Sequence, residues 1–278
     1  MTVAVLSKFR ITLSDEVPSL RIIRPFFITN SLPLNLNLLI ILIKQPINKT
    51  NSNIQVIYHL WLALATLLIL SLATSLLLLV FEPLFPVING SVSSQTSGLA
   101  LIASITGSIL FSYGLLVWMT REYFRKRFKP LLKAPFYWLL ISVATGVAIA
   151  AMVNVVSHYY PPQPGDVSTF ALIKQDGAIA LTVLFVATVW LAPMFEEYLF
   201  RGLLYDSLLQ RFGTIVAICA SAVVFMGFHL IEYSDYWVGM GAILLLGIFL
   251  ALLRQYSRSI LGPMLCHASY NASILLLA

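Results

Sequence analysis

Residues 56–81 read VIYHLWLALATLLILSLATSLLLLVF, a run that contains no Asp, Glu, Lys or Arg. The hydrocarbon core of a bilayer is about 30 Å thick, and a helix needs about 20 apolar residues to cross it. This run is long enough to do so. It therefore predicts a transmembrane helix, and the rest of the chain extends that prediction.

The composition of the 278 residues is that of an integral membrane protein, with 59% hydrophobic and 10% charged residues. Soluble domains carry about 25% charged residues. Apolar stretches of spanning length recur along the chain. They lie at about 56–81, 98–120 and 135–159, from about 177 and 214 onward, and at about 236–253 and 259–278. The fold class we predict is an all-α, polytopic membrane helix bundle with about seven transmembrane helices.

Positive charge gathers between the second and third spans, where residues 121–133 read REYFRKRFKPLLK. Six cations stand there against Glu122 alone, and loops rich in Lys and Arg stay on the cytoplasmic side. Counting outward from this loop, we expect a multi-pass protein of the cell membrane with a cytoplasmic N-terminus. The net charge of +6 then needs no nucleic-acid partner, and the lipid bilayer is the partner we expect.

Three regions follow from the pattern of spans. Residues 1–55 hold no run long enough to span and show no signal-peptide pattern, so we expect a loosely ordered cytoplasmic tail. Residues 56–177 would form three accessory transmembrane helices. Residues 178–278 contain polar residues within apolar stretches, and we expect the function to lie there.

The stretch 192–202, APMFEEYLFRG, places charges inside a predicted helix of about 33 residues, on the order of 50 Å long. Glu196 and Glu197 would lie roughly 20 Å above its cytoplasmic end, and Pro193 predicts a local break. Each charge at such depth costs about 2.5–3.5 kcal/mol unless it faces a partner or a polar cavity. Glu197 and Arg201 have the spacing of a helical ion pair. Glu196 points about 100° away and is left for acid–base chemistry.

Two further spans carry polar residues at a similar depth. Phe225 and His229 share one helix face, and so do His267 and Asn271, because each pair is separated by four residues. A histidine or asparagine in a membrane helix often serves only to hydrogen-bond a neighbouring helix. The common depth, however, permits one buried site with the glutamates.

Two chemistries suit such a site. Glu196, His229 and His267 could hold a divalent metal such as Zn. Alternatively, a glutamate could deprotonate a water while histidine and asparagine stabilise an oxyanion. Asparagine is a rare zinc ligand, and no HExxH arrangement occurs. We therefore prefer chemistry without a metal or other cofactor.

Three motifs carry a resemblance to a known family. EEYLFR matches E-E-x-x-x-R, FMGFH matches F-x-x-x-H, and HASYN matches H-x-x-x-N. In this order on successive helices they resemble the CPBP family of intramembrane proteases. That family includes the CAAX prenyl endopeptidases of the Ras-converting type and the bacteriocin self-immunity proteins with an ABI domain. The resemblance covers residues 178–278, which it implies are a CPBP/ABI-like catalytic domain.

The resemblance implies an intramembrane endopeptidase that acts on a membrane-proximal or lipidated protein. By this likeness Glu196 activates a water that His229 helps to hold, and His267 and Asn271 stabilise the oxyanion. The supporting residues would be Glu197, Arg201 and Phe225. Two other functions stay open at this point, a non-catalytic scaffold or chaperone and a proton-coupled transporter. The chain shows no inverted repeat of the kind common in transporters.

Overall fold

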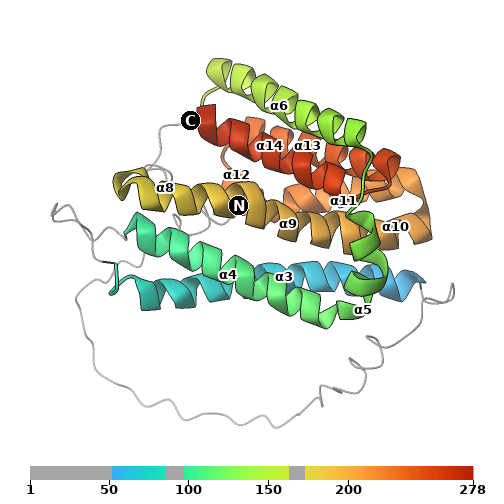
Figure 1. Cartoon of the computed structure of the whole chain (residues 1–278), viewed down its shortest axis with the longest axis horizontal. Helices are drawn as coiled ribbons and strands as arrows, with labels where there is room; N and C mark the ends of the chain where they lie inside the picture. The colour runs from blue at the N-terminus through green and yellow to red at the C-terminus, as the bar shows by residue number, and fades with distance from the viewer. Residues whose placement is uncertain (1–51, 86–96, 163–172, 278) are drawn as a thin grey trace, which may run out of the picture.

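The computed structural model describes residues 52–85, 97–162 and 173–277 (Figure 1). Nearly all of the tail predicted at residues 1–55 lies outside these ranges, so its conformation stays a prediction. All secondary structure in the described ranges is helical. This confirms the all-α fold.

Five helical stretches are long and apolar enough to cross a membrane. They are α3 (Ser52–Phe81, apolar from Asn53), α4 (Gly98–Met119), α6 (Phe136–Tyr159), the run Gly177–Phe212, and α13 (Trp237–Ser257). Two further predicted spans are shorter, α11 (Thr214–Phe228) with 15 residues and α14 (Leu261–Leu277) with 17. The polytopic bundle is confirmed, and the number seven stays a prediction.

Helix α3 shows why the bundle belongs in lipid. Its outward leucines are all more than half exposed, although no charged residue accompanies them; they are Leu64, Leu68, Leu72, Leu76 and Leu79. A helix that is apolar on every side is stable only in a protein core or in a membrane. No described residue covers this face of α3. Its leucine side chains are therefore suited to contact with lipid hydrocarbon chains.

The centre of the fold is one continuous helical run of 36 residues, Gly177–Phe212. It consists of α8 (Gly177–Val186), η4 (Ala187–Leu191), α9 (Ala192–Glu197), η5 (Tyr198–Leu204) and α10 (Tyr205–Phe212), where η4 and η5 are π-helical. The run does not end at Pro193. The wider π turns absorb the missing backbone donor, as such turns do within α-helices, often at functional sites.

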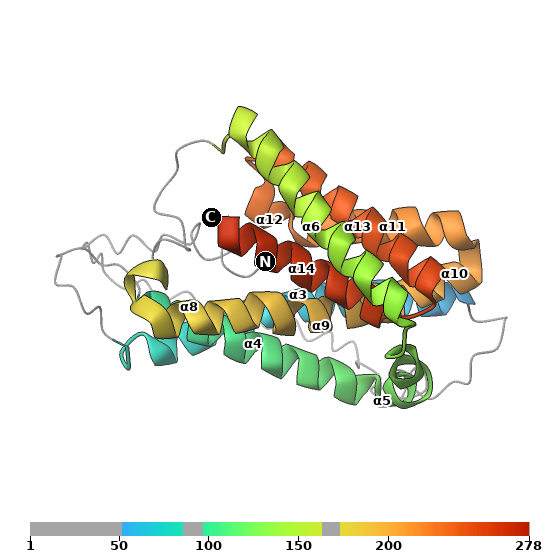
Figure 2. The ribbon, with the colours of Figure 1, turned by 45° about the horizontal axis from the view of Figure 1, so that its top comes forward.

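The central run is enclosed from both sides (Figures 1 and 2). Helices α3 and α4 pack along one side, and α11, α13 and α14 pack along the other. The enclosed side chains are almost fully buried; they include Phe195, Tyr198, Phe200, Leu203 and Tyr205. This enclosure removes the charged groups of the same run from lipid.

Helix α6 lies outermost, against α14 and α13 (Figure 2). The crossing of α6 and α14 is very close at Gly146. A Cβ atom there would lie 2.1 Å from Ser269 Oγ and 2.2 Å from the Cys266 carbonyl oxygen. Such approach through small residues is typical of helix pairs in membranes. Since His267 follows Cys266, this crossing fixes the position of that histidine.

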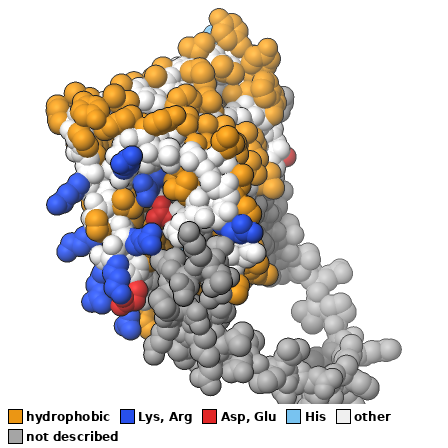
Figure 3. Space-filling view, turned by 90° about the vertical axis from the view of Figure 1, so that its right-hand side faces the viewer, with side chains coloured by type: hydrophobic (Ala, Val, Ile, Leu, Met, Phe, Trp, Pro, Cys, Tyr) orange, Lys and Arg blue, Asp and Glu red, His pale blue; other side chains and the backbone are white. Residues whose placement is uncertain are grey.

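The basic stretch at residues 121–133 connects α4 to α6 at one end of the bundle. It forms α5 (Arg121–Tyr123), η2 (Phe124–Phe128) and η3 (Lys129–Leu131). Phe128 is buried, with its ring centroid 4.7 Å from that of Tyr198. The Leu131 carbonyl accepts bonds from the Ser259 hydroxyl and the Ile260 amide. Figure 3 shows the lysine and arginine side chains gathered on this end.

Candidate active site

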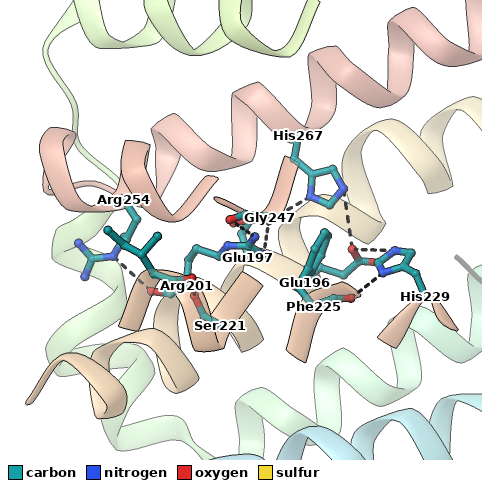
Figure 4. A network of polar contacts seen from close by, with 10 residues as sticks. Glu196, Glu197, Arg201, Ser221, Phe225, His229, Gly247, Arg254 and His267 are labelled. Carbon is teal, nitrogen blue, oxygen red and sulfur yellow. Dashed lines mark hydrogen bonds and ion pairs between the residues drawn. The ribbon is translucent and has the colours of Figure 1, made fainter. Parts of the chain in front are cut away.

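Glu196 and Glu197 occupy the end of α9, just before the π turns of η5. Their side chains point in different directions within the buried centre of the bundle (Figure 4). Glu196 is 2% exposed and Glu197 is fully buried. At this depth a charge is stable only with partners close by, and the two carboxylates have different ones.

Glu196 faces two histidines. Its Oε2 lies 4.0 Å from Nε2 of His229 and 3.8 Å from Nε2 of His267. The two rings come from different helices, at the end of α11 and in the middle of α14. Three of the residues predicted to share a site are therefore brought together, with their polar atoms converging from three helices.

His229 stands where the α-helix is interrupted, between α11 and α12 (Leu230–Tyr233). Its Nδ1 lies 2.9 Å from the carbonyl oxygen of Phe225. A carbonyl can only accept a hydrogen bond, so Nδ1 carries the proton. In the neutral ring Nε2 is then an acceptor directed toward Glu196.

Glu197 binds two cationic or potentially cationic groups through one oxygen. Its Oε1 accepts from Nη1 of Arg201 at 3.3 Å and lies 3.0 Å from Nδ1 of His267. The predicted ion pair is thus present. The contact with His267 was not predicted, and it means that Glu197 orients the histidine that in turn faces Glu196.

Arg201 is fully buried and joins several helices. Its Nη2 donates to the Gly247 carbonyl of α13 at 3.0 Å, and its guanidinium lies 4.3 Å from the centre of the Phe225 ring. Within the described ranges, Arg201 Nε and Glu197 Oε2 have no hydrogen-bond partner. Both atoms lie in the same polar cluster, where a buried water could satisfy them.

The Phe225 ring packs against His229, His267 and Arg201. Its ring centroid lies 4.7 Å from that of His229 and 5.6 Å from that of His267, in the latter case edge to face. Together with the cation–π contact to Arg201, this fixes the orientation of both imidazoles. The supporting role predicted for Phe225 stays a prediction.

Asn271 lies one turn beyond His267 on α14, and its Nδ2 donates to the Thr188 carbonyl of η4 at 2.8 Å. The amide carries two N–H groups, so this bond takes up one and leaves the other. The oxyanion role of Asn271 stays a prediction.

A second buried ion pair was missed by sequence reasoning. Arg254 of α13 donates from Nη2 to Asp206 Oδ1 at 2.8 Å and from Nε to the Arg201 carbonyl at 3.2 Å. Arg254 was not among the predicted site residues, yet it is only 9% exposed. The available signal was Asp206, an acidic residue within the longest apolar helix.

Residues 178–273 match the family model described as type II CAAX prenyl endopeptidase, Rce1-like. This part of the chain is similar to that family. The match contains all three motifs and every residue of the polar cluster, and it confirms the resemblance seen in the sequence. No curated protein and no solved structure matches the chain.

A metal ion would require shorter distances between these side chains. A tetrahedral zinc ion with ligands at about 2.0–2.1 Å holds its ligand atoms about 3.3 Å apart. Glu196 Oε2 is farther than this from both histidine nitrogens, and no group of three or more His, Cys, Asp or Glu side chains in the described ranges is arranged to hold a metal. As they stand, these side chains do not fit zinc.

Proposed function

We propose that the chain is an intramembrane endopeptidase of the CAAX prenyl protease type that hydrolyses a peptide bond with a water activated by Glu196. The observation that carries the proposal is the convergence of Glu196 Oε2 with the Nε2 atoms of His229 and His267 in a buried place. Separations of 3.8 and 4.0 Å are too long for direct hydrogen bonds. A water with bonds of about 2.8 Å can bridge them.

The hydrogen-bond directions indicate how this water is held. His229 presents an acceptor at Nε2, because its Nδ1 proton is given to the Phe225 carbonyl. The water can therefore donate one hydrogen to His229 and the other to Glu196. In this orientation a lone pair of the water oxygen is free to attack a carbonyl carbon, and Glu196 is placed to take the proton.

Charge balance gives His267 a different role. The buried cluster contains two carboxylates and one permanent cation, Arg201. The proposed mechanism requires both ring nitrogens of His267 to carry hydrogen, with Nδ1–H donating to Glu197. Its Nε2–H then points toward the Glu196 side of the site and can donate to a developing oxyanion, as electrostatic catalysis requires. Glu197 and Arg201 are positioning residues in this scheme.

The reaction then proceeds in two proton transfers. Glu196 accepts a proton from water as the oxygen bonds to the scissile carbonyl carbon, and His267 stabilises the oxyanion. Glu196 next gives that proton to the leaving nitrogen as the carbon–nitrogen bond breaks. The products are a carboxylic acid and an amine. The second N–H of Asn271 is the proposed additional oxyanion donor.

We also propose the location, the orientation and the substrate of the protein. The exposed apolar helices favour a multi-pass protein of the cell membrane, and the basic end is placed on the cytoplasmic side together with the N-terminus. The substrate would be a membrane-proximal or lipidated protein. Nucleic acid has no place in this function, because the basic residues lie beside apolar spans.

The test is cleavage of a peptide library, with and without a prenyl group, by protein reconstituted in vesicles. We expect wild-type protein to cleave a subset of peptides and Glu196→Gln to lose at least about a hundredfold in rate. Glu82→Gln is the matched control, because it makes the same chemical change at an exposed carboxylate outside the cluster. Folded wild-type protein that cleaves no peptide, or proton flux that depends on Glu196, would overturn the proposal.

A further inference from the structure

The segment from Arg121 to Lys133, here called the basic segment, carries more positive charge than the described residues neutralise. All six of its cations are exposed: Arg121, Arg125, Lys126, Arg127, Lys129 and Lys133. Its one carboxylate, Glu122, pairs with Arg125 at 3.2 Å and with Lys126 at 2.8 Å. No salt bridge from any other described residue reaches the remaining four cations.

Exposed aromatic residues place the basic segment at the level of lipid headgroups. Trp118 precedes the segment and is 68% exposed, while Phe136 and Tyr137 follow it and are 72% and 58% exposed. Aromatic side chains are enriched where a membrane meets water. The cations between them therefore face a layer that contains phosphate groups, and Figure 3 shows them gathered on that end of the molecule.

The basic segment is a fixed part of the fold. Phe124 and Phe128 stack with centroids 5.3 Å apart, and the Phe128 ring meets Tyr198 of η5 edge to face. The Tyr123 hydroxyl donates to Asp206 Oδ2 at 2.8 Å. Burial and the neighbouring Asp206 raise the pKa of Tyr123 well above its usual range, so the phenol stays protonated and keeps donating.

Asp206 connects this contact to the polar cluster. Its other oxygen accepts from Arg254, whose Nε donates to the carbonyl of Arg201. Arg201 in turn holds Glu197, next to Glu196. A continuous series of hydrogen bonds thus runs from the surface of the basic segment to the helix that bears the two glutamates.

We propose that the basic segment binds anionic phospholipid headgroups of the surrounding membrane, and that the Tyr123–Asp206 hydrogen bond transmits this binding to the central helix. The six cations supply the attraction, at about fivefold in affinity for each cation near the surface. Because Phe124 and Phe128 pack against Tyr198 of η5, headgroups bound to the basic segment order η5 and α10. This proposal does not depend on the peptidase function.

The binding half is tested with detergent-solubilised full-length protein, titrated with dioctanoyl phosphatidylglycerol or dioctanoyl phosphatidylcholine. We expect a preference for phosphatidylglycerol that falls about fivefold in Arg127→Gln and that weakens in high salt. Lys174→Gln is the matched control, since it removes one exposed cation at the other end of the bundle. The variant R125Q/R127Q/K129Q should abolish the preference.

Three results would overturn the binding half. Wild-type protein could show no preference between the lipids, or the triple variant could keep the preference. Inorganic phosphate or a polyglutamate peptide could also displace the lipid at equal concentration, which would assign the surface to free anions or to an acidic protein partner.

The coupling half is tested by hydrogen exchange of peptides from residues 198–212, which needs no enzymatic activity. Phosphatidylglycerol should slow exchange there in wild-type protein. Tyr123→Phe keeps every charge of the basic segment and removes only the bond to Asp206, so it should bind the lipid equally well without the slowing. Equal slowing in Tyr123→Phe would contradict the coupling.

Discussion

Replacing Gly146 with alanine tests whether the crossing of α6 and α14 positions the candidate active site. The added Cβ would lie 2.2 Å from the Cys266 carbonyl oxygen and 3.0 Å from the Tyr270 amide nitrogen, both backbone atoms. Rotation of a side chain cannot relieve these contacts. The two helices must separate instead.

The size of the separation follows from the contact distances. Moving from 2.2 Å to a tolerable contact beyond 3.0 Å requires a displacement of about 1 Å. His267 follows Cys266, so a shift of α14 by this amount would distort its 3.0 Å contact with Glu197. Overpacking of this kind costs about 1–3 kcal/mol of stability, and a misplacement of about 1 Å lowers an enzymatic rate about a hundredfold.

Thermal unfolding in detergent and peptide cleavage in vesicles measure the two effects. Gly241→Ala is the matched control, because a Cβ on that α13 glycine would meet nothing within 4 Å. It should leave the rate unchanged and stabilise the helix slightly. Adding Ser269→Ala to Gly146→Ala should not restore activity, since the Cys266 carbonyl still blocks the Cβ. Equal behaviour of Gly146→Ala and Gly241→Ala would refute this reasoning.

Three further predictions concern the polar cluster. Arg201→Ala should destabilise the protein by about 3–5 kcal/mol in thermal or chemical unfolding, because it leaves Glu197 buried without its permanent cation; an unchanged unfolding midpoint would show that Arg201 does not stabilise the buried carboxylate. Asn271→Ala should lower the cleavage rate by about a hundredfold, the usual effect of losing an oxyanion donor, with a loss of folded protein as the sign of a purely structural role. Treatment with 1,10-phenanthroline followed by metal analysis should leave the cleavage rate within about twofold, whereas inactivation that zinc reverses would establish a metal-dependent reaction.

The membrane fold could be predicted from the sequence because spanning helices need long apolar runs, and α3, α4, α6 and α13 have them. The residues at which the helices end were harder to predict. Helix α11 ends at Phe228 although the apolar pattern continues, because His229 leaves the α-helical conformation. The local sequence does not predict that the α-helix ends at His229.

Helical spacing within one segment could be predicted from the sequence, but contacts between distant segments could not. Helical spacing correctly paired Glu197 with Arg201 and placed Phe225 beside His229. The contact between Glu197 and His267 depends on how closely α9 and α14 approach, which tertiary packing decides. The pairing of Arg254 with Asp206 could not be predicted either, because the two residues are 48 positions apart in sequence.

The most direct test of the central claim is a double-mutant cycle on peptide cleavage with Glu196→Gln, His229→Ala and the variant that carries both. If the two side chains hold and activate one water, each single substitution should lower the rate by about 10²–10⁴-fold, and the double variant should be no slower than the slower single variant. Losses that multiply, or a Glu196→Gln enzyme that keeps its rate, would contradict the account.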